Sequence, residues 1–233
     1  MGEFPGDIYS NLNFPTAADD LPYCFIDMVT TIDGKILSGK RDEHVLDLGS
    51  KTDHMLMKRI EGQADGVLVG AQTLRTTLAK WSPASRARIV VSASGNLPYE
   101  SQFFDGENTF VATSESSTLQ PNGRARLLKA GQNTVDFRKL FHRLRNELGI
   151  QTLLVLGGSE LNAQLLAANL VDELFVTIAP KVKLGRDVPT YADGDPLPRE
   201  SLQRYNLIEH HVIGDEIFIR YRRDQFADNP ITG

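Results

Sequence analysis

Two short glycine-containing segments are the residues of this chain best suited to chemistry. Gly70-Ala71-Gln72-Thr73 and Gly157-Gly158-Ser159 each follow an apolar run and precede a stretch with helical spacing. Backbone N–H groups at the start of a helix point toward one spot, and the helix dipole adds positive potential there. Glycine lets a phosphate approach because it carries no Cβ. Either segment alone is more typical of a plain turn, but two in one sheet favour a ligand with several phosphates.

Other motifs with a known chemistry are missing from the sequence. It contains no G-x-x-x-x-G-K-[ST] loop, no G-x-S-x-G elbow and no G-x-G-x-x-G fingerprint. Its histidines show no HExxH spacing, and Cys24 is the single cysteine, so we expect no metal site. These absences disfavour a metal-dependent or hydrolytic mechanism. The remaining functions are catalysis with an organic cofactor, or ligand binding without catalysis.

The elements that must position the glycine segments alternate between strand and helix. Short apolar runs predict strands over 23–29, 65–70, 88–94, 108–114, 126–131, 152–156 and 172–182, and a hairpin over 207–222 that turns at Gly214-Asp215. Helices are predicted from the Ser50 cap to Gly62, from Ala71, from the Asp136 cap to Gly149, and over 160–169, where Leu161, Leu165 and Ala168 would be buried. This order predicts an α/β fold in three layers: a mostly parallel central sheet, helices on both faces and an antiparallel C-terminal hairpin.

Composition sets the broad class of the protein. The 233 residues are 41 % hydrophobic with a net charge of −5, and no basic block or long apolar run suggests nucleic acid or a membrane as a partner. We expect an N-terminal arm over 1–20 that packs loosely or is partly disordered, a single domain over 21–225 and a tail over 226–233. The lone cysteine sits in an apolar run and fits the core of a cytoplasmic protein, and the mixed, acidic N-terminus does not read as a secretory signal.

Three motifs together resemble one enzyme family. "MVTTIDGKI", "ADGVLVGAQTL" and "LVLGGSELNAQLLAANLVDELFVTIAPKV" look like the pyrimidine reductases of riboflavin biosynthesis: the C-terminal reductase domain of the bifunctional deaminase-reductase and its stand-alone relatives. The resemblance covers Tyr23 to Tyr221. It implies a dihydrofolate-reductase-like fold, NADPH as cofactor and a homodimer. The implied reaction reduces a ribosyl group to ribityl in 5-amino-6-(5-phosphoribosylamino)uracil or its 2,5-diamino-pyrimidinone phosphate counterpart.

The resemblance also assigns cofactor positions. It places Val29, Thr30 and Thr31 on the nicotinamide side, Gly70 and Thr73 at the phosphate region, Ser92 and Ser94 near the adenosine ribose and its 2′-phosphate, and Gly157, Gly158, Ser159, Glu160 and Leu161 around the pyrophosphate. No catalytic residue is assigned, although Asp33 is a weak candidate for a proton relay. The deaminase zinc motif is absent, so the chain would be the reductase only.

The substrate side departs from the family. The pocket is assigned to Ser50, Glu61, Leu78 and Leu156. Relatives usually carry an acidic pair where Thr76, Thr77 and Leu78 stand, Glu in place of Leu156, and Arg in place of Glu61. Each lost charge-assisted hydrogen bond costs about 1.5–3 kcal/mol. Either nearby cations replace the missing groups, from Lys58, Arg59, Arg75 and Lys80, or the substrate differs.

Three functions therefore stay open from sequence. The first is NADPH-dependent reduction of the riboflavin precursor, a phosphorylated ribosylaminopyrimidine. The second is reduction of another carbonyl, imine or pterin-like substrate on the same fold, and the third is nucleotide binding without catalysis. The preference for NADPH over NADH and the dimer interface are also left open.

Overall fold

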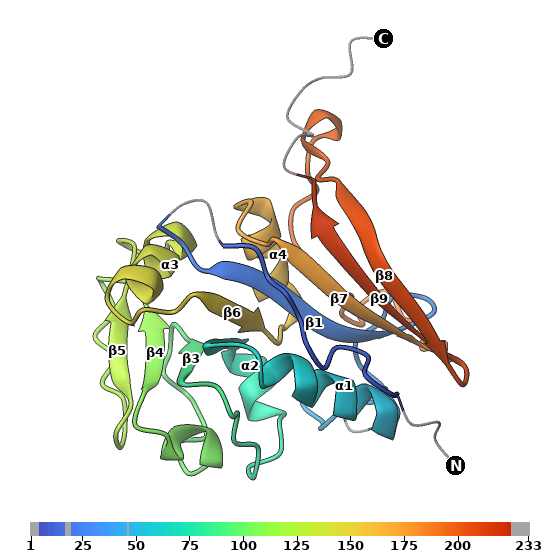
Figure 1. Ribbon diagram of the computed structural model, residues 1–233. Coiled ribbons are helices and arrows are strands. Elements are labelled where there is room, and N and C mark those ends of the chain that lie inside the picture. Colours follow the sequence, from blue (N-terminus) through green and yellow to red (C-terminus); the bar gives the residue numbers. More distant parts are fainter. Residues whose placement is uncertain (1–4, 17–19, 46, 225–233) are drawn as a thin grey trace.

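A single nine-stranded sheet runs through the molecule (Figure 1). The computed structural model describes residues 5–16, 20–45 and 47–224. Its elements are β1 (Tyr23–Thr31), α1 (Lys51–Glu61), β2 (Gly66–Gly70), α2 (Ala71–Arg75), β3 (Ala87–Val91), η1 (Gln102–Asp105), β4 (Thr109–Thr113), β5 (Arg126–Lys129), α3 (Phe137–Asn146), β6 (Thr152–Val155), α4 (Ser159–Ala167), β7 (Glu173–Ala179), η2 (Arg199–Ser201), β8 (Tyr205–Ile213) and β9 (Glu216–Arg223). The strand order is β5-β4-β3-β2-β6-β1-β7-β9-β8.

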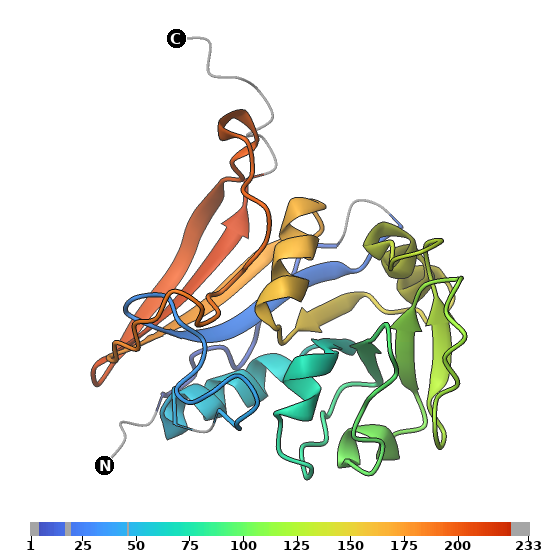
Figure 2. The same ribbon diagram turned by 180° about the vertical axis from the view of Figure 1, so that it is seen from behind.

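The sheet is parallel from β5 to β7, and the β8–β9 hairpin adds two antiparallel strands at one edge. Alternate residues of β2 enter different cores: Leu68 packs with α3 and α4, whereas Val67 packs with α1 and Val69 with α2 and η1. Figures 1 and 2 show these helices on opposite faces of the sheet. The predicted α/β class, its three layers and its C-terminal hairpin are confirmed. We call the side covered by α1 and α2 the α1 face.

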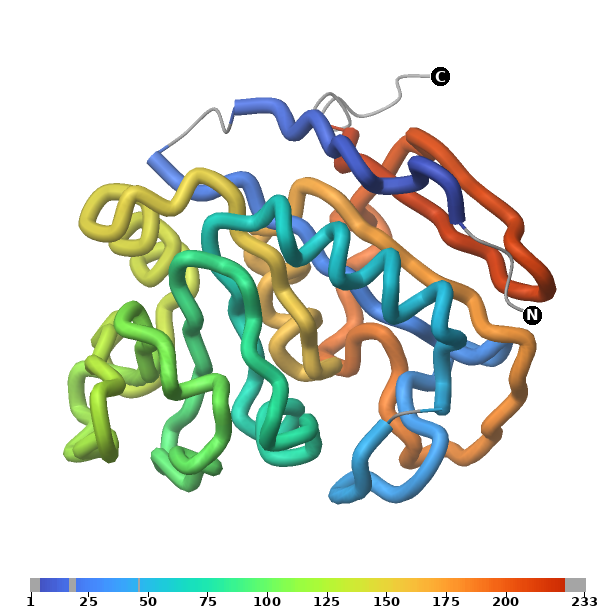
Figure 3. The backbone as a smooth tube through the Cα atoms, turned by 60° about the horizontal axis from the view of Figure 1, so that its bottom comes forward, coloured from blue at the N-terminus to red at the C-terminus, as the bar shows by residue number. Residues whose placement is uncertain are grey.

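The N-terminal segment is packed more closely than the sequence led us to expect. Phe14 stacks on Phe25 of β1 at a ring separation of 4.4 Å, and Tyr9 meets Phe175 of β7 edge-on at 5.2 Å. Residues 5–16 thus cover part of the α1 face beside the β8–β9 hairpin (Figure 3), because their aromatic side chains complete that core. The prediction of a loose arm was wrong for these residues. The predicted tail lies outside the described residues, and the boundaries at 20 and 225 stay predictions.

Several element ends differ from the predicted ranges: β1 runs on to Thr31, β5 ends at Lys129, α3 ends at Asn146, β7 ends at Ala179 and β8 begins at Tyr205. Two further differences have a clear local cause. The strand predicted to reach residue 94 ends at Val91, because Ser92 begins a turn in which its hydroxyl accepts the Gly95 N–H. The helix predicted over 160–169 ends at Ala167, with Asn169 in the left-handed region at φ 57°. Ala168 is therefore exposed instead of buried, whereas Cys24 lies in the core as predicted. No helix in the described part is long and apolar enough to cross a bilayer.

Candidate active site

The two glycine segments meet at one edge of the sheet. β2 and β6 are neighbouring parallel strands, so the turns that follow them lie side by side. The Gly70 N–H donates to the Gly157 carbonyl at 2.7 Å. Gly70 caps α2 and Gly158 caps α4, and neither helix start has a side-chain hydrogen bond in its cap. The first N–H groups of both helices are therefore left to an external acceptor.

The space between these turns is narrow, above all at Gly158. A Cβ on Gly70 would lie 3.4 Å from the Gly158 nitrogen, and one on Gly158 would lie 2.9 Å from Thr73 Oγ1. Two adjoining helix starts without side chains between them fit a pyrophosphate, because both dipoles stabilise negative charge there. Ser159 is 5 % exposed, and its carbonyl oxygen accepts the Asp193 N–H at 3.2 Å. Leu161 is 6 % exposed and can contribute only main-chain groups.

The other predicted cofactor residues extend this cradle along the same edge. They follow or end β3, β2, β6 and β1, which are consecutive in the sheet. Val29 lies on the α1 face with Thr31, whereas Thr30 lies on the opposite face, so the three side chains do not share one surface. The Ser92 and Ser94 hydroxyls accept main-chain N–H groups of their own turn. The structure thus brings these positions to one edge of the sheet.

Asp33 holds a turn at this edge. Its carboxylate accepts from the Thr31 hydroxyl at 2.6 Å and from the N–H groups of Lys183 and Leu184 at 3.0 and 2.8 Å. These hydrogen bonds, led by that of Thr31, lower the Asp33 pKa to about 2. The side chain is therefore ionised near neutral pH and has no proton to donate. This geometry speaks against the proton-relay role, which remains an untested prediction.

Two of the four residues assigned to the substrate pocket, Glu61 and Leu78, are hydrogen-bonded to Trp81, and a third, Leu156, packs against the same core as Trp81. Glu61, at the end of α1, accepts from the Ala84 N–H at 3.0 Å and from Trp81 Nε1 at 3.3 Å. Trp81 and Leu156 both pack against the α1-face core. The main-chain N–H of Trp81 donates to the Leu78 carbonyl. Ser50 is separate from this group, because it caps the other end of α1.

The structure adds one residue that the motifs did not indicate. Asp27 lies within β1 opposite Phe175 of β7, and Ile26 pairs with Val155, which places Asp27 beside Leu156. It is 8 % exposed, and burial, reinforced by Asp53 and Glu61, raises its pKa well above the ordinary value. An acid in the middle of the apolar run "YCFIDMV" was the signal available in the sequence.

The surroundings of Leu156 are acidic. Asp27, Asp53 and Glu61 are buried on the α1 face, and we call these three residues the acidic wall. Among the nearby cations, Arg59 donates to the Ile8 carbonyl and Arg75 to the Asn96 carbonyl, while Lys58 and Lys80 are exposed. One alternative left open by the sequence was that these nearby cations replace the missing substrate-binding groups. Such a cluster of cations is not seen beside Leu156. Within the described ranges, no group of three or more His, Cys, Asp or Glu side chains could hold a metal ion.

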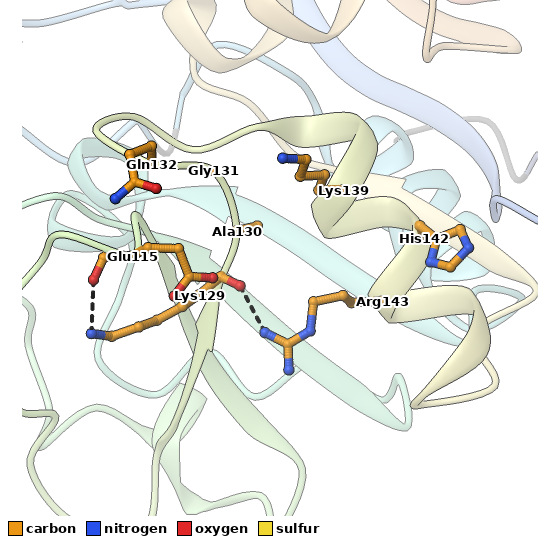
Figure 4. A pocket seen from close by; sticks show the side chains of 8 residues that line it. All are labelled: Glu115, Lys129, Ala130, Gly131, Gln132, Lys139, His142 and Arg143. Atoms are coloured by element: carbon orange, nitrogen blue, oxygen red, sulfur yellow. Dashed lines mark hydrogen bonds between the residues drawn. The ribbon is translucent and has the colours of Figure 1, made fainter.

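A hollow of about 380 Å³ lies elsewhere, between the end of β5 and α3 (Figure 4). Lys129, Lys139, His142 and Arg143 line it with Glu115. Lys129 Nζ is already bonded to the Glu115 and Ser117 carbonyls, and Arg143 to Glu147. None of the predicted site residues lines this hollow, so it is not the candidate active site.

Comparisons with known proteins agree with this geometry. The family described as "RibD C-terminal domain" matches residues 22–219. The chain is 28 % identical over 214 residues to the 2,5-diamino-6-ribosylamino-4(3H)-pyrimidinone 5′-phosphate reductase of Methanothermobacter thermautotrophicus, covering 86 % of this chain and 97 % of that protein. It is 26 % identical over 225 residues to a reductase of the same name from Archaeoglobus fulgidus, covering 87 % and 99 %.

Solved structures show the same fold. Acinetobacter baumannii RibD superposes with a TM-score of 0.72 at 16 % identity, over 89 % of this chain and 60 % of that one. A pyrimidine reductase-like protein from Corynebacterium diphtheriae superposes with a TM-score of 0.67 at 21 % identity, over 88 % and 92 %. The chain thus spans about 60 % of the RibD chain but nearly all of the single-function relatives.

Proposed function

Because this chain belongs to the RibD C-terminal domain family, and is therefore an oxidoreductase with a nicotinamide cofactor, we propose that it is an NADPH-dependent reductase of riboflavin biosynthesis. Its substrate would be 2,5-diamino-6-ribosylamino-4(3H)-pyrimidinone 5′-phosphate, the compound in the names of its relatives, or the 5-amino-6-(5-phosphoribosylamino)uracil form. The product carries a ribityl chain in place of the ribosyl group.

The convergence of the glycine segments at the edge of β2 and β6 carries this proposal. The main-chain N–H groups there would hold the pyrophosphate, and the end of β1 would place the nicotinamide beside Leu156. Bound NADPH supplies a hydride, and the chain contributes mainly the orientation of the two reactants. Trp81 and Leu156 present apolar surface that excludes water from the reacting carbon. Ser92 and Ser94, next along the edge, support a contact with the ribose and its 2′-phosphate.

The test is NADPH oxidation by the purified protein with each of the two ribosylaminopyrimidine phosphates, together with identification of the ribityl product. We expect turnover with at least one of them, and a lower kcat/KM with NADH. Absence of turnover with both substrates would remove the pathway assignment. NADPH binding without any product would instead support a nucleotide-binding protein.

One observation favours a second candidate, a reductase of the same fold with a different carbonyl, imine or pterin-like substrate. The acidic wall and Leu156 lie where a phosphate-binding cluster would have favoured the riboflavin precursor. A panel of such compounds with NADPH separates the two functions. A higher kcat/KM for the riboflavin precursor than for every other compound would eliminate this candidate.

The proposal includes a homodimer in the cytoplasm. β8 is an edge strand of the sheet, and the outer hairpin exposes Leu207, Ile208, Val212 and Ile217. Exposed apolar side chains beside unpaired main-chain groups favour association with a second copy. The single buried cysteine supports the reducing compartment.

A further inference from the structure

We propose that the Asp27 carboxyl group accepts hydrogen bonds from the N–H groups of the substrate's pyrimidine ring. The ring would then lie beneath α1, and the substrate phosphate would lie at the rim of the site, which we define as the carboxyl ends of β1 and β7. This inference rests on the proposed function and specifies which end of the substrate faces the acidic wall. It also assigns a binding role to a residue outside the family motifs.

The position of Asp27 in β1 is the first argument. Tyr23 and Phe25 belong to the α1-face core, so Asp27, two residues further along the strand, lies on the same face. It stands between Leu156 and Phe175, directly below the turn that begins at Gly157. It is more than nine-tenths buried, yet the described part of the chain gives its carboxyl group no hydrogen-bond partner. The Asp27 oxygens are not among the fully enclosed polar atoms of the described residues, so they remain within reach of a ligand that donates hydrogen bonds.

A second unpartnered group comes from a different segment. Tyr9 is 5 % exposed, and no described residue hydrogen-bonds its hydroxyl group. Its ring lies against Phe175, the register partner of Asp27, and the Asp27 carboxyl interacts electrostatically with the hydroxyl. The α1 face thus offers one unused acceptor and one unused donor near each other. A pyrimidinone ring presents N–H groups and a carbonyl, which is the complementary set.

The charge of the acidic wall decides between the two ends of the substrate. Asp53 and Glu61 come from α1, and Glu216 from β9 adds a further carboxyl group at the Ser50 cap. A phosphate placed against these groups would be repelled, whereas N–H donors are attracted. A metal ion is not supported as the occupant, because none of the described carboxylate groups is arranged to hold one.

The phosphate has a more favourable place at the rim. Lys35 follows β1, and Lys181 and Lys183 follow β7, at the carboxyl ends of these strands. Their amino groups donate to main-chain carbonyl oxygens: Lys35 to Val188 at 3.0 Å, Lys181 to Leu48 at 2.9 Å and Lys183 to Ser38 at 2.7 Å. A substrate with its ring on Asp27 and its phosphate toward these lysines would present its ribosyl carbon near the end of β1.

The experiment uses ligands that cannot be reduced further, which separates binding from turnover. Calorimetry with NADP⁺ present measures the affinity for the ribitylaminopyrimidinone phosphate product and for its dephosphorylated form. We expect Asp27→Asn to weaken both ligands equally, by about tenfold or more, because a charge-assisted hydrogen bond is lost. Tyr9→Phe should weaken both by a smaller factor. NADP⁺ affinity should stay unchanged in both variants.

Glu61→Gln is the matched control. It removes the same charge from the acidic wall, but both oxygens of Glu61 are already bonded to Ala84 and Trp81. Its effect should therefore be well below that of Asp27→Asn. Three results would each overturn the inference. They are an unchanged affinity in Asp27→Asn, equal losses of affinity in Asp27→Asn and Glu61→Gln, and a loss in Asp27→Asn that is confined to the phosphorylated ligand. Wild-type protein that binds the product but never reduces the substrate would contradict the proposed function and leave this inference standing.

Discussion

Asp53 should set part of the pH dependence of stability. Burial, reinforced by Glu216, raises its pKa to about 6 even though the Thr177 hydroxyl donates to it. The folded chain therefore holds the proton more tightly than the unfolded chain, whose Asp titrates near 4. Stability contributed by this proton is fully present below the unfolded pKa and is lost as pH rises through 6. The loss amounts to roughly 2–3 kcal/mol at most.

Asp53→Asn removes this titration. We expect the variant to be more stable than the wild type at pH 8 and to lose the difference near pH 4, as measured by urea unfolding across that range. A parallel pH profile in the two proteins would show that Asp53 does not titrate differently on folding.

The two glycines of the cradle should respond differently to a methyl group. A Cβ on Gly158 meets only the hydroxyl of Thr73, whereas Gly157 has φ +77° and its Cβ would lie 2.8 Å from the sulfur of Met28. Gly158→Ala should therefore weaken NADPH binding about tenfold with little loss of melting temperature, and Gly157→Ala should destabilise the fold itself. Calorimetric titration and thermal unfolding of both variants check this. Unchanged cofactor affinity in Gly158→Ala would make the cradle an ordinary turn.

Residue types alone pointed to a candidate cofactor side, and they gave no comparable indication of the substrate side. Glycine has few roles between a strand and a helix, so Gly70 and Gly157 could be found by reading along the chain. Asp27 could not be assigned in that way, because its environment comes from β7, α1 and the N-terminal segment. What an isolated carboxyl does depends on neighbours that are distant in sequence.

At the scale of an element, Ser50 caps α1, and its predicted place in the substrate pocket stays a prediction. Its hydroxyl accepts the N–H groups of Thr52 and Asp53, and it donates to Glu216. Ser50→Ala should lower the free energy of unfolding by about 1–2 kcal/mol and leave KM for the pyrimidine unchanged. Chemical denaturation and steady-state kinetics test both parts.

Asp136→Ala is the comparison for that variant. Asp136 caps α3 by accepting the Lys139 N–H. Among the described residues, its side chain has no buried partner comparable to the Glu216 that Ser50 contacts. We expect a smaller loss than for Ser50→Ala. A raised KM in Ser50→Ala at unchanged stability would return Ser50 to the substrate pocket.

The elements themselves were largely predictable, and the reasons are physical. α3 repeats apolar residues at helical spacing after Asp136, so its buried face and its N-terminal cap could be read, although the helix ends at Asn146 and not at Gly149. The end of β3 could not, because the turn at Ser92 is fixed by a hydroxyl that is equally compatible with a strand. Ala168 was misplaced because small apolar residues at a helix end carry little information about burial.

At the scale of the whole molecule, the open edge of the sheet predicts the oligomeric state. Val212 of β8 is 65 % exposed, and Val182, which lies outside the strands in the segment after β7, is 61 % exposed. We expect light scattering to give the mass of a dimer for the wild type and that of a monomer for Val212→Lys, because the variant would bury a charge at the interface. Val182→Lys should leave the dimer intact. A monomeric wild type at micromolar concentration would contradict the proposed dimer.

The place of β1 in the sheet also governs how the molecule is made. β1 precedes the other described strands of the sheet along the chain, yet Tyr23 pairs with Thr152 and Phe25 with Glu173. Pairing between such distant segments is slow, and the waiting strand is exposed to aggregation in the meantime. On the ribosome, the strand that carries Asp27 has both its neighbours only after β7 has emerged. The edge of the sheet that would hold the dinucleotide is therefore complete only late in the synthesis of the chain.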